Sequence, residues 1–141
     1  MSGVDIRSLS IGEVVAETSF GLTRDSLARY AGASGDFNPI HYRDDIAASA
    51  GLPGVLAHGM LTMGMAIQPV ADWVGDPARI LDYEVRFTRP VVVDATAGAE
   101  LAVVATVGHL DLDAQIARID LTVSCDGVTV LGKARATVSL A

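Results

Sequence analysis

An apolar stretch from Gly59 to Val74 constrains the fold more than any other part of this chain. Its hydrophobic side chains fall on nearly every face of a helix, which is typical of a helix surrounded by protein. Pro69 lacks a backbone N–H and crowds the carbonyl four residues earlier, so we expect the helix to bend or end there. Other elements of the fold must cover most of this helix.

Strand-like segments lie on both sides of the apolar helix. Residues 13–22 predict a first strand, and residues 81–88 alternate apolar and polar side chains as a half-buried strand does. The pair Asp126-Gly127 is a strong signal for a hairpin turn between two of the later strands. These later strand-like runs cover residues 99–109, 114–125 and 128–140.

Two short helices are expected between the first strand and the apolar helix. Thr23 offers an N-cap side chain, and apolar residues recur at helical spacing over residues 24–33. Residues 44–50 predict a second helix that ends at Gly51. One antiparallel sheet curved around one apolar helix satisfies this order, so we expect a single α+β domain over residues 1–141. Because the sheet leaves part of the helix open, we also expect a dimer.

The charge balance excludes one large class of partners. The 141 residues include 10 basic and 17 acidic ones, for a formal net charge of −7, and the basic residues are scattered. Nucleic acid is therefore a poor partner. A highly anionic ligand could bind only where a few Arg side chains or backbone N–H groups reverse the local field.

Several features bear on the compartment. The single cysteine, Cys125, has no internal disulfide partner, which fits a reducing compartment. The first residues show no basic region followed by an apolar one, so no secretory signal is visible. Polar residues and a proline interrupt the apolar stretch from Val55 to Val74, so we expect no membrane span. We therefore expect a cytoplasmic location.

Three residues that perform or orient proton chemistry, Asp36, Asn38 and His41, lie within six positions of one loop. Spacing alone does not unite Asp36 and His41, because an extended chain would hold them about 17 Å apart. Pro39 fixes its own φ and pushes the preceding residue out of the helical region, so the loop is stiff. Such a loop can bring both side chains to one face. The alternative is turn chemistry, in which these side chains cap backbone groups and flank a helix.

The pair His58-Gly59 stands at the start of the apolar helix. The first N–H groups of a helix lack internal partners and lie at the positive end of its dipole, so they can hold a developing oxyanion. Gly59 has no side chain to block the approach. The simpler alternative is a glycine that merely begins a helix. His58 is a weaker candidate for a direct role, since its side chain could instead cap or support the loop.

Two arginines invite a phosphate-binding interpretation. Arg86 and Arg89 stand on or just after the strand that precedes Pro90. The alternation of Arg86 with Glu84 favours a solvated strand face instead. We therefore do not count either arginine as a contact to a carrier.

Two segments resemble the signature of the MaoC-like, R-specific enoyl-thioester hydratases. The first is YAGASGDFNPIH at residues 30–41, and the second is AHGML at residues 57–61. Residues 73–77 and 83–88 are further similar to the catalytic subunits of mycobacterial-type (3R)-hydroxyacyl-ACP dehydratases, which pair with a non-catalytic hot-dog subunit. The resemblance extends along the whole chain.

This resemblance implies a hot-dog fold and the reversible dehydration of (3R)-hydroxyacyl thioesters to trans-2-enoyl thioesters in fatty-acid metabolism. It makes Asp36 and His41 the catalytic dyad, and Asn38 the residue that orients their loop. It assigns the Gly59 N–H to the oxyanion hole. It also implies an acyl-CoA or acyl-ACP substrate, no cofactor and no metal, and either a homodimer or a heterodimer with a non-catalytic hot-dog subunit. Two other functions stay open on this fold, an acyl-thioester hydrolase and a non-catalytic partner subunit.

Overall fold

A five-stranded antiparallel sheet organises residues 3–141, the part of the chain that the computed structural model describes. Its strands lie in the order β1-β3-β4-β5-β2, so β1 and β2 form the two edges. The four strands expected after the apolar helix and the one expected before it are all confirmed. Their bounds are β1 (Val14–Leu22), β2 (Ile80–Phe87), β3 (Ala99–Asp111), β4 (Ile116–Cys125) and β5 (Val128–Ser139).

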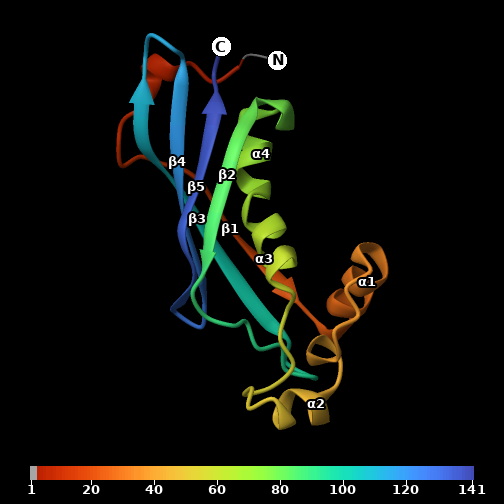
Figure 1. The fold of residues 1–141 in the computed structure, drawn as a ribbon. Coiled ribbons are helices and arrows are strands. Elements are labelled where there is room, and N and C mark those ends of the chain that lie inside the picture. Colours follow the sequence, from red (N-terminus) through yellow and green to blue (C-terminus); the bar gives the residue numbers. More distant parts are fainter. Residues whose placement is uncertain (1–2) are drawn as a thin grey trace.

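The helices fall between β1 and β2, as the sequence predicts. The apolar stretch forms two helices rather than one, and they meet at Ile67, next to the expected break at Pro69. Figure 1 shows α3 and α4 lying along the sheet, whereas α1 and α2 project from its lower end. The helices are α1 (Arg24–Ser34), α2 (Asp44–Ser49), α3 (Gly59–Ala66) and α4 (Gln68–Val74), with single 3-10 turns at η1 (Ile6–Ser8), η2 (Pro39–His41) and η3 (Pro77–Arg79).

Local sequence signals explain where α1 begins and where the last hairpin turns. The Thr23 side chain accepts a hydrogen bond from the backbone N–H of Ser26, and the Ser26 hydroxyl accepts one from the backbone N–H of Thr23. This reciprocal cap satisfies two N–H groups that the helix itself leaves free. Gly35 ends α1 in the left-handed region at φ 76°. Asp126 and Gly127 turn the β4–β5 hairpin with φ values of 50° and 74°, as their residue types predict.

The core lies between α4 and the inner face of the sheet. Alternate residues of β3, from Leu101 to Val107, are fully buried, and α4 adds Val70 and Val74. Helix α3 is less well covered, and Met60 on it is 61% exposed. The expectation of a helix enclosed on nearly every side is therefore wrong for α3 within this chain. Helix α4 buries one face, whereas Gln68 and Asp72 on it are exposed.

Strand β2 departs from the alternation expected for it. Tyr83 and Val85 are half-buried, but Leu81 and Phe87 are 57% and 55% exposed, so the expectation that both are buried is wrong. The strand lies at the edge of the sheet, and its pairing with β5 shifts register twice, which rotates side chains away from the core. The Tyr83 hydroxyl donates to the Met63 carbonyl at 2.8 Å and so ties this edge to α3, and burial raises the pKa of Tyr83 to about 12.

Within residues 3–141, no helix combines the length and the apolar character needed to cross a membrane.

Candidate active site

The segment between β1 and α3, residues 23–57, leaves the sheet and carries the loop that the sequence singles out; we call it the helical excursion. Its last residues run beside the β2–β3 connection, residues 88–98. The Ala57 N–H donates to the Val91 carbonyl at 2.9 Å, and the Val93 N–H donates to the Val55 carbonyl at 2.9 Å. These backbone bonds fix the end of the helical excursion against the rest of the fold.

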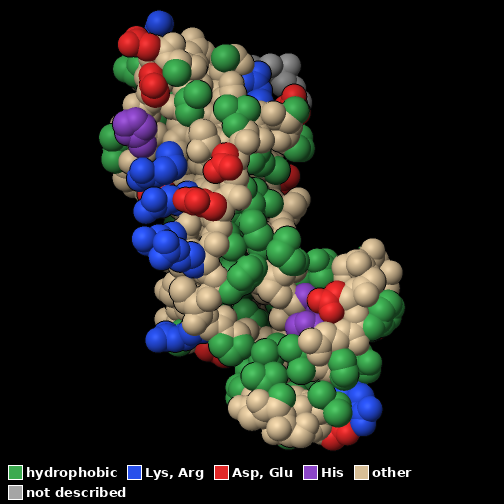
Figure 2. Space-filling model, in the orientation of Figure 1, with side chains coloured by type: hydrophobic (Ala, Val, Ile, Leu, Met, Phe, Trp, Pro, Cys, Tyr) green, Lys and Arg blue, Asp and Glu red, His purple; other side chains and the backbone are tan. Residues whose placement is uncertain are grey.

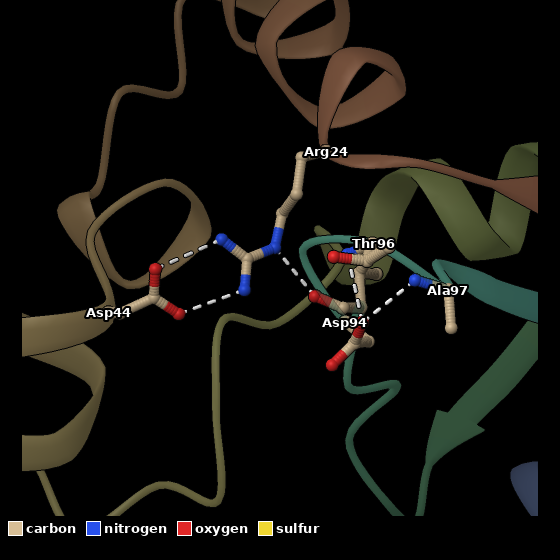
Figure 3. Close-up of polar contacts among 6 residues, drawn as sticks. Arg24, Asp44, Asp94, Thr96 and Ala97 are labelled. Carbon is tan, nitrogen blue, oxygen red and sulfur yellow. Dashed lines mark hydrogen bonds and ion pairs between the residues drawn. The ribbon is translucent and has the colours of Figure 1, made fainter.

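Arg24 provides a second attachment at the other end of the helical excursion (Figure 3). Its Nε donates to the Val93 carbonyl at 2.6 Å, and its two terminal nitrogens lie 2.8 and 3.2 Å from the Asp44 carboxylate. The hydrogen bond from Arg24 lowers the pKa of Asp44. Hydrogen bonds from two backbone N–H groups lower the pKa of Asp94. The Asp94 carboxylate adds a further negative charge near the guanidinium. One side chain thus joins α1, α2 and the β2–β3 connection. The sequence analysis missed this contact, because the residues it joins are far apart in the chain.

The Asp36 loop shows both of the arrangements that the sequence left open. The Asp36 Oδ1 accepts a hydrogen bond from the Asn38 N–H at 3.1 Å, and the Asn38 Oδ1 accepts one from the Ile40 N–H at 3.2 Å. These are turn and cap contacts, and Pro39 follows as the first residue of η2. The same turn places the Asp36 Oδ2 3.9 Å from the His41 Nε2. Turn chemistry and the meeting of these two side chains therefore coexist.

His41 is buried, and the backbone holds its neutral ring in one tautomer. Its Nδ1 lies 2.7 Å from the Leu56 carbonyl, with only 8% of the residue exposed. A carbonyl oxygen can only accept a hydrogen bond, so Nδ1 carries the proton. In the neutral ring, Nε2 then holds the lone pair, and this is the atom that faces Asp36. The imidazole is thus poised to accept a proton.

His58 contacts both the Asp36 loop and the His41 ring. Its Nε2 donates to the Asp36 carbonyl at 3.1 Å, and its ring stacks on that of His41 at a centroid distance of 3.8 Å. Tyr30 packs edge-on against it at 4.7 Å. Burial lowers the pKa of His58, and the nearby His41 lowers it further. Its Nδ1 is buried and has no hydrogen-bond partner among the described residues. These contacts favour the supporting role that the sequence left open for this residue.

A cavity of about 310 Å³ opens beside His41. Gly59, the first residue of α3, also lines it, together with Thr62 and Phe87. Within the described part of the chain, the Gly59 N–H has no hydrogen-bond acceptor, as expected for the first residue of a helix. Asp36 is not among the residues that line the cavity, and its side chain is 51% exposed. The imidazole and the free amide thus share one cavity, with the carboxylate on the outer side of His41.

Histidine and acidic side chains gather where the helical excursion meets the body of the protein, next to an apolar surface (Figure 2). Ligand atoms of Asp36, His41 and His58 lie within 4.8 Å of one another, a spacing at which they could hold a metal ion. One nitrogen of each ring already faces a backbone carbonyl, which orders both imidazoles. The same atoms suit proton transfer, and the expectation of no metal and no cofactor stays a prediction.

Comparisons with known proteins agree with this architecture. The chain matches the family model of the MaoC like domain over residues 8–123. This match covers most of the chain, and the chain therefore belongs to the MaoC-like family.

Individual relatives show how far the likeness extends. The chain is 40% identical over 81 residues to 3-hydroxyacyl-thioester dehydratase X of Mycobacterium tuberculosis, a match that covers 57% of this chain and 28% of that protein. A solved MaoC-like dehydratase superposes with a TM-score of 0.95 at 34% identity, over 99% of this chain and 43% of the other. The (R)-hydratase from A. caviae involved in PHA biosynthesis superposes with a TM-score of 0.82 at 26% identity, over 96% of this chain and 99% of the other. The hot-dog fold is confirmed, and the chain spans less than half the length of the first two relatives.

Proposed function

We propose that this protein is a hydro-lyase that interconverts (3R)-hydroxyacyl thioesters and trans-2-enoyl thioesters in fatty-acid metabolism. Membership of the MaoC-like family and the names of its relatives support this function. The observation that carries it is the 3.9 Å separation of the Asp36 Oδ2 and the His41 Nε2, with His41 lining the same cavity as the free amide of Gly59.

The reaction sets three tasks. A proton must leave the carbon next to the thioester carbonyl, the hydroxyl on the next carbon must leave as water, and negative charge that develops on the thioester oxygen must be stabilised. Positioned acid–base groups contribute roughly 10²- to 10⁴-fold to such a reaction. An oxyanion donor contributes about 3 kcal/mol.

In our proposal, His41 moves the proton. Its Nε2 holds a lone pair because Nδ1 donates to the Leu56 carbonyl, so Nε2 can accept the carbon-bound proton. The imidazolium then returns this proton to the departing hydroxyl, which leaves as water while the carbon–carbon double bond forms. The hydration direction reverses these steps, with a water oxygen as the nucleophile.

The carboxylate of Asp36 binds the hydroxyl in this proposal. A distance of 3.9 Å between the Asp36 Oδ2 and the His41 Nε2 is too long for a direct hydrogen bond. It leaves both atoms within reach of one hydroxyl oxygen between them. The Asp36 carboxylate also stabilises the positive charge on His41 in the transition state. Asn38 keeps the loop in this shape through its bond to the Ile40 N–H.

The Gly59 N–H receives the thioester oxygen. It is the first backbone amide of α3, where the helix dipole favours negative charge, and it lines the same cavity as His41. The carbonyl of a bound thioester can therefore point to this amide while the neighbouring carbon faces the imidazole.

Hydration of crotonyl-CoA and longer enoyl thioesters, followed by the loss of enoyl absorbance, tests the function. We expect the variants Asp36→Asn and His41→Ala each to lose about 10²- to 10⁴-fold in kcat/KM. Undiminished activity in both variants would refute the dyad. Release of free thiol from saturated acyl thioesters by the wild type, without hydration, would select a thioester hydrolase instead.

We further propose that one hot-dog unit over residues 1–141 works as a dimer. The exposed apolar residues Met60, Leu81 and Phe87 lie on α3 and on the edge strand β2, where a second hot-dog unit would cover them. The partner is either a second copy or a non-catalytic hot-dog subunit. Mass measurement of the protein alone and with candidate partners separates the two, and a monomer under both conditions would contradict the proposal. We also propose a cytoplasmic location, which fits the single cysteine.

A further inference from the structure

Arg89 lines two neighbouring cavities. It lines the cavity that contains His41 and Gly59, and it also lines a second cavity of about 310 Å³ that reaches the β4–β5 hairpin at Asp126. Pro90 and Val130 line both cavities as well, so the two cavities are neighbours along this wall. The sequence places Arg89 only after a strand; the structure places it on the wall that extends from the candidate catalytic residues to the outside.

The charge of Arg89 is not compensated within the described part of the chain. Arg89 is exposed, and no carboxylate lies within ion-pair distance of it there. Other arginines differ in this respect, because Arg24, Arg29, Arg43 and Arg118 each pair with an aspartate. In a chain with a net charge of −7, an unpaired guanidinium at a cavity is one of the few places that can attract an anion.

The backbone at Arg89 is held from both sides. The Thr88 N–H donates to the Val130 carbonyl at 3.1 Å, and the Val91 carbonyl accepts from the Ala57 N–H at 2.9 Å. Pro90, between these contacts, has a fixed φ. The root of the Arg89 side chain is therefore fixed relative to His41 and Gly59, while the guanidinium reaches into solvent.

We propose that Arg89 binds the phosphate of a phosphopantetheine-linked acyl thioester, whether the arm belongs to coenzyme A or to an acyl carrier protein. This inference rests on the proposed function, because it concerns the far end of the same substrate. In both carriers a flexible arm joins the phosphate to the thioester sulfur. With the thioester beside His41 and Gly59, the arm leaves along the wall that Arg89 shares between the two cavities. A guanidinium offers a planar pair of donors that fits a phosphate.

Arg86 lies on a solvated strand face, whereas Arg89 lies beyond the strand. Arg86 lies within β2 and opposite Gly132 of β5, and it lines neither of the two cavities. Arg89 follows the end of β2 at Phe87. The strand alternation that turns Arg86 to solvent therefore does not extend to Arg89.

The test compares substrates that share an acyl group but differ in the phosphate. Enoyl-CoA and enoyl-carrier protein contain it, whereas the enoyl thioester of pantetheine lacks it. For Arg89→Ala we expect the KM for the phosphorylated substrates to rise about ten- to a hundred-fold with kcat nearly unchanged. The kinetics with the pantetheine thioester should stay at the wild-type level. A larger effect with one phosphorylated substrate than with the other identifies the carrier.

Two further variants serve as matched controls. Arg135→Ala removes another exposed cation, which lies on β5 opposite Glu84 and lines neither cavity, and should leave KM unchanged. Asp126→Asn removes a negative charge from the second cavity and should lower the KM for phosphorylated substrates. Equal effects of Arg89→Ala on phosphorylated and unphosphorylated substrates would overturn the proposal.

Calorimetric binding of coenzyme A and of pantetheine separates this proposal from the proposed function. Weaker binding of coenzyme A to Arg89→Ala than to the wild type supports the phosphate site even where no enoyl thioester is hydrated. If the wild type hydrates enoyl thioesters but Arg89→Ala binds coenzyme A as tightly as the wild type does, the proposed function is retained and the phosphate site is overturned.

Discussion

The substitution Gly59→Ala tests whether the start of α3 faces the thioester. An added Cβ would lie 3.0 Å from the Cε1 atom of Phe87, closer than nearly all such contacts in proteins. Phe87 is 55% exposed and its ring can move by a few tenths of an ångström, so the fold should tolerate the change. Both the methyl group and the displaced ring would then occupy part of the cavity beside the Gly59 amide.

The expected cost falls on catalysis rather than on stability. Alanine is favoured over glycine within a helix by up to about 1 kcal/mol, which offsets the crowding against Phe87. A thioester carbonyl displaced by about 1 Å from its donor loses on the order of 10²-fold in rate. For Gly59→Ala we therefore expect kcat/KM to fall by about this factor, or roughly 2.7 kcal/mol, with a nearly unchanged Tm.

The assay is the hydration of an enoyl thioester together with a thermal unfolding curve. Gly64→Ala is the matched control, because it lies on the same helix and its Cβ would have nothing within 4 Å. This control should gain stability and keep full activity. Adding Phe87→Leu to Gly59→Ala should restore part of the lost rate. A folded Gly59→Ala variant with the kcat/KM of the wild type would refute the placement of the thioester at this amide.

Three further substitutions test the supports of the site and the fold. Arg24→Ala loses a charge-assisted hydrogen bond to the β2–β3 connection, worth about 1.5–3 kcal/mol. We expect this substitution to accelerate amide hydrogen exchange more in the helical excursion than in the sheet. Equal acceleration in both regions would argue against a local attachment. Burial lowers the pKa of His58 below 6.5, so the unfolded chain takes up the proton first and the free energy of unfolding should fall as the pH drops below that value. Urea unfolding at several pH values should show a smaller decrease for His58→Gln than for the wild type, and an identical decrease would contradict this assignment. Gly98→Ala should lower the free energy of unfolding, measured with a denaturant, by at least about 2 kcal/mol, because the φ of Gly98 is 68° and a Cβ would collide with the Leu22 carbonyl. Gly12→Ala should lower it less, because Gly12 has a φ of 90° but nothing among the described residues within 4 Å of an added Cβ.

Much of the fold could be predicted because its signals are local. The cap at Thr23 and the hairpin at Asp126-Gly127 depend on a few adjacent residues, and the structure contains both. The exposure of Leu81 and Phe87 could not be predicted in the same way. It depends on the edge position of β2 and on two register shifts against β5, which are properties of the strand pairing rather than of the strand sequence.

In the candidate site, too, the local features could be predicted from the sequence and the long-range contacts could not. Asp36, Asn38 and His41 are close in sequence, so the stiff loop indicates that the Asp36 and His41 side chains can reach one face, with turn chemistry as the alternative. The tautomer of His41 depends on the carbonyl of Leu56, 15 residues further along, so only the structure assigns it. The stacking of His58 on His41 also required the three-dimensional arrangement.

The attachment of the helical excursion has a consequence for how this chain tolerates changes in length. Connections between strands usually accept insertions readily. Here Val91 and Val93 hold both ends of the helical excursion through the Ala57, Val55 and Arg24 contacts. One residue inserted before Val91 would shift Val91 and Val93 relative to Ala57, Val55 and Arg24, while every strand kept its pairing. Redesign of the acyl preference should therefore alter other loops and leave this short connection at its present length.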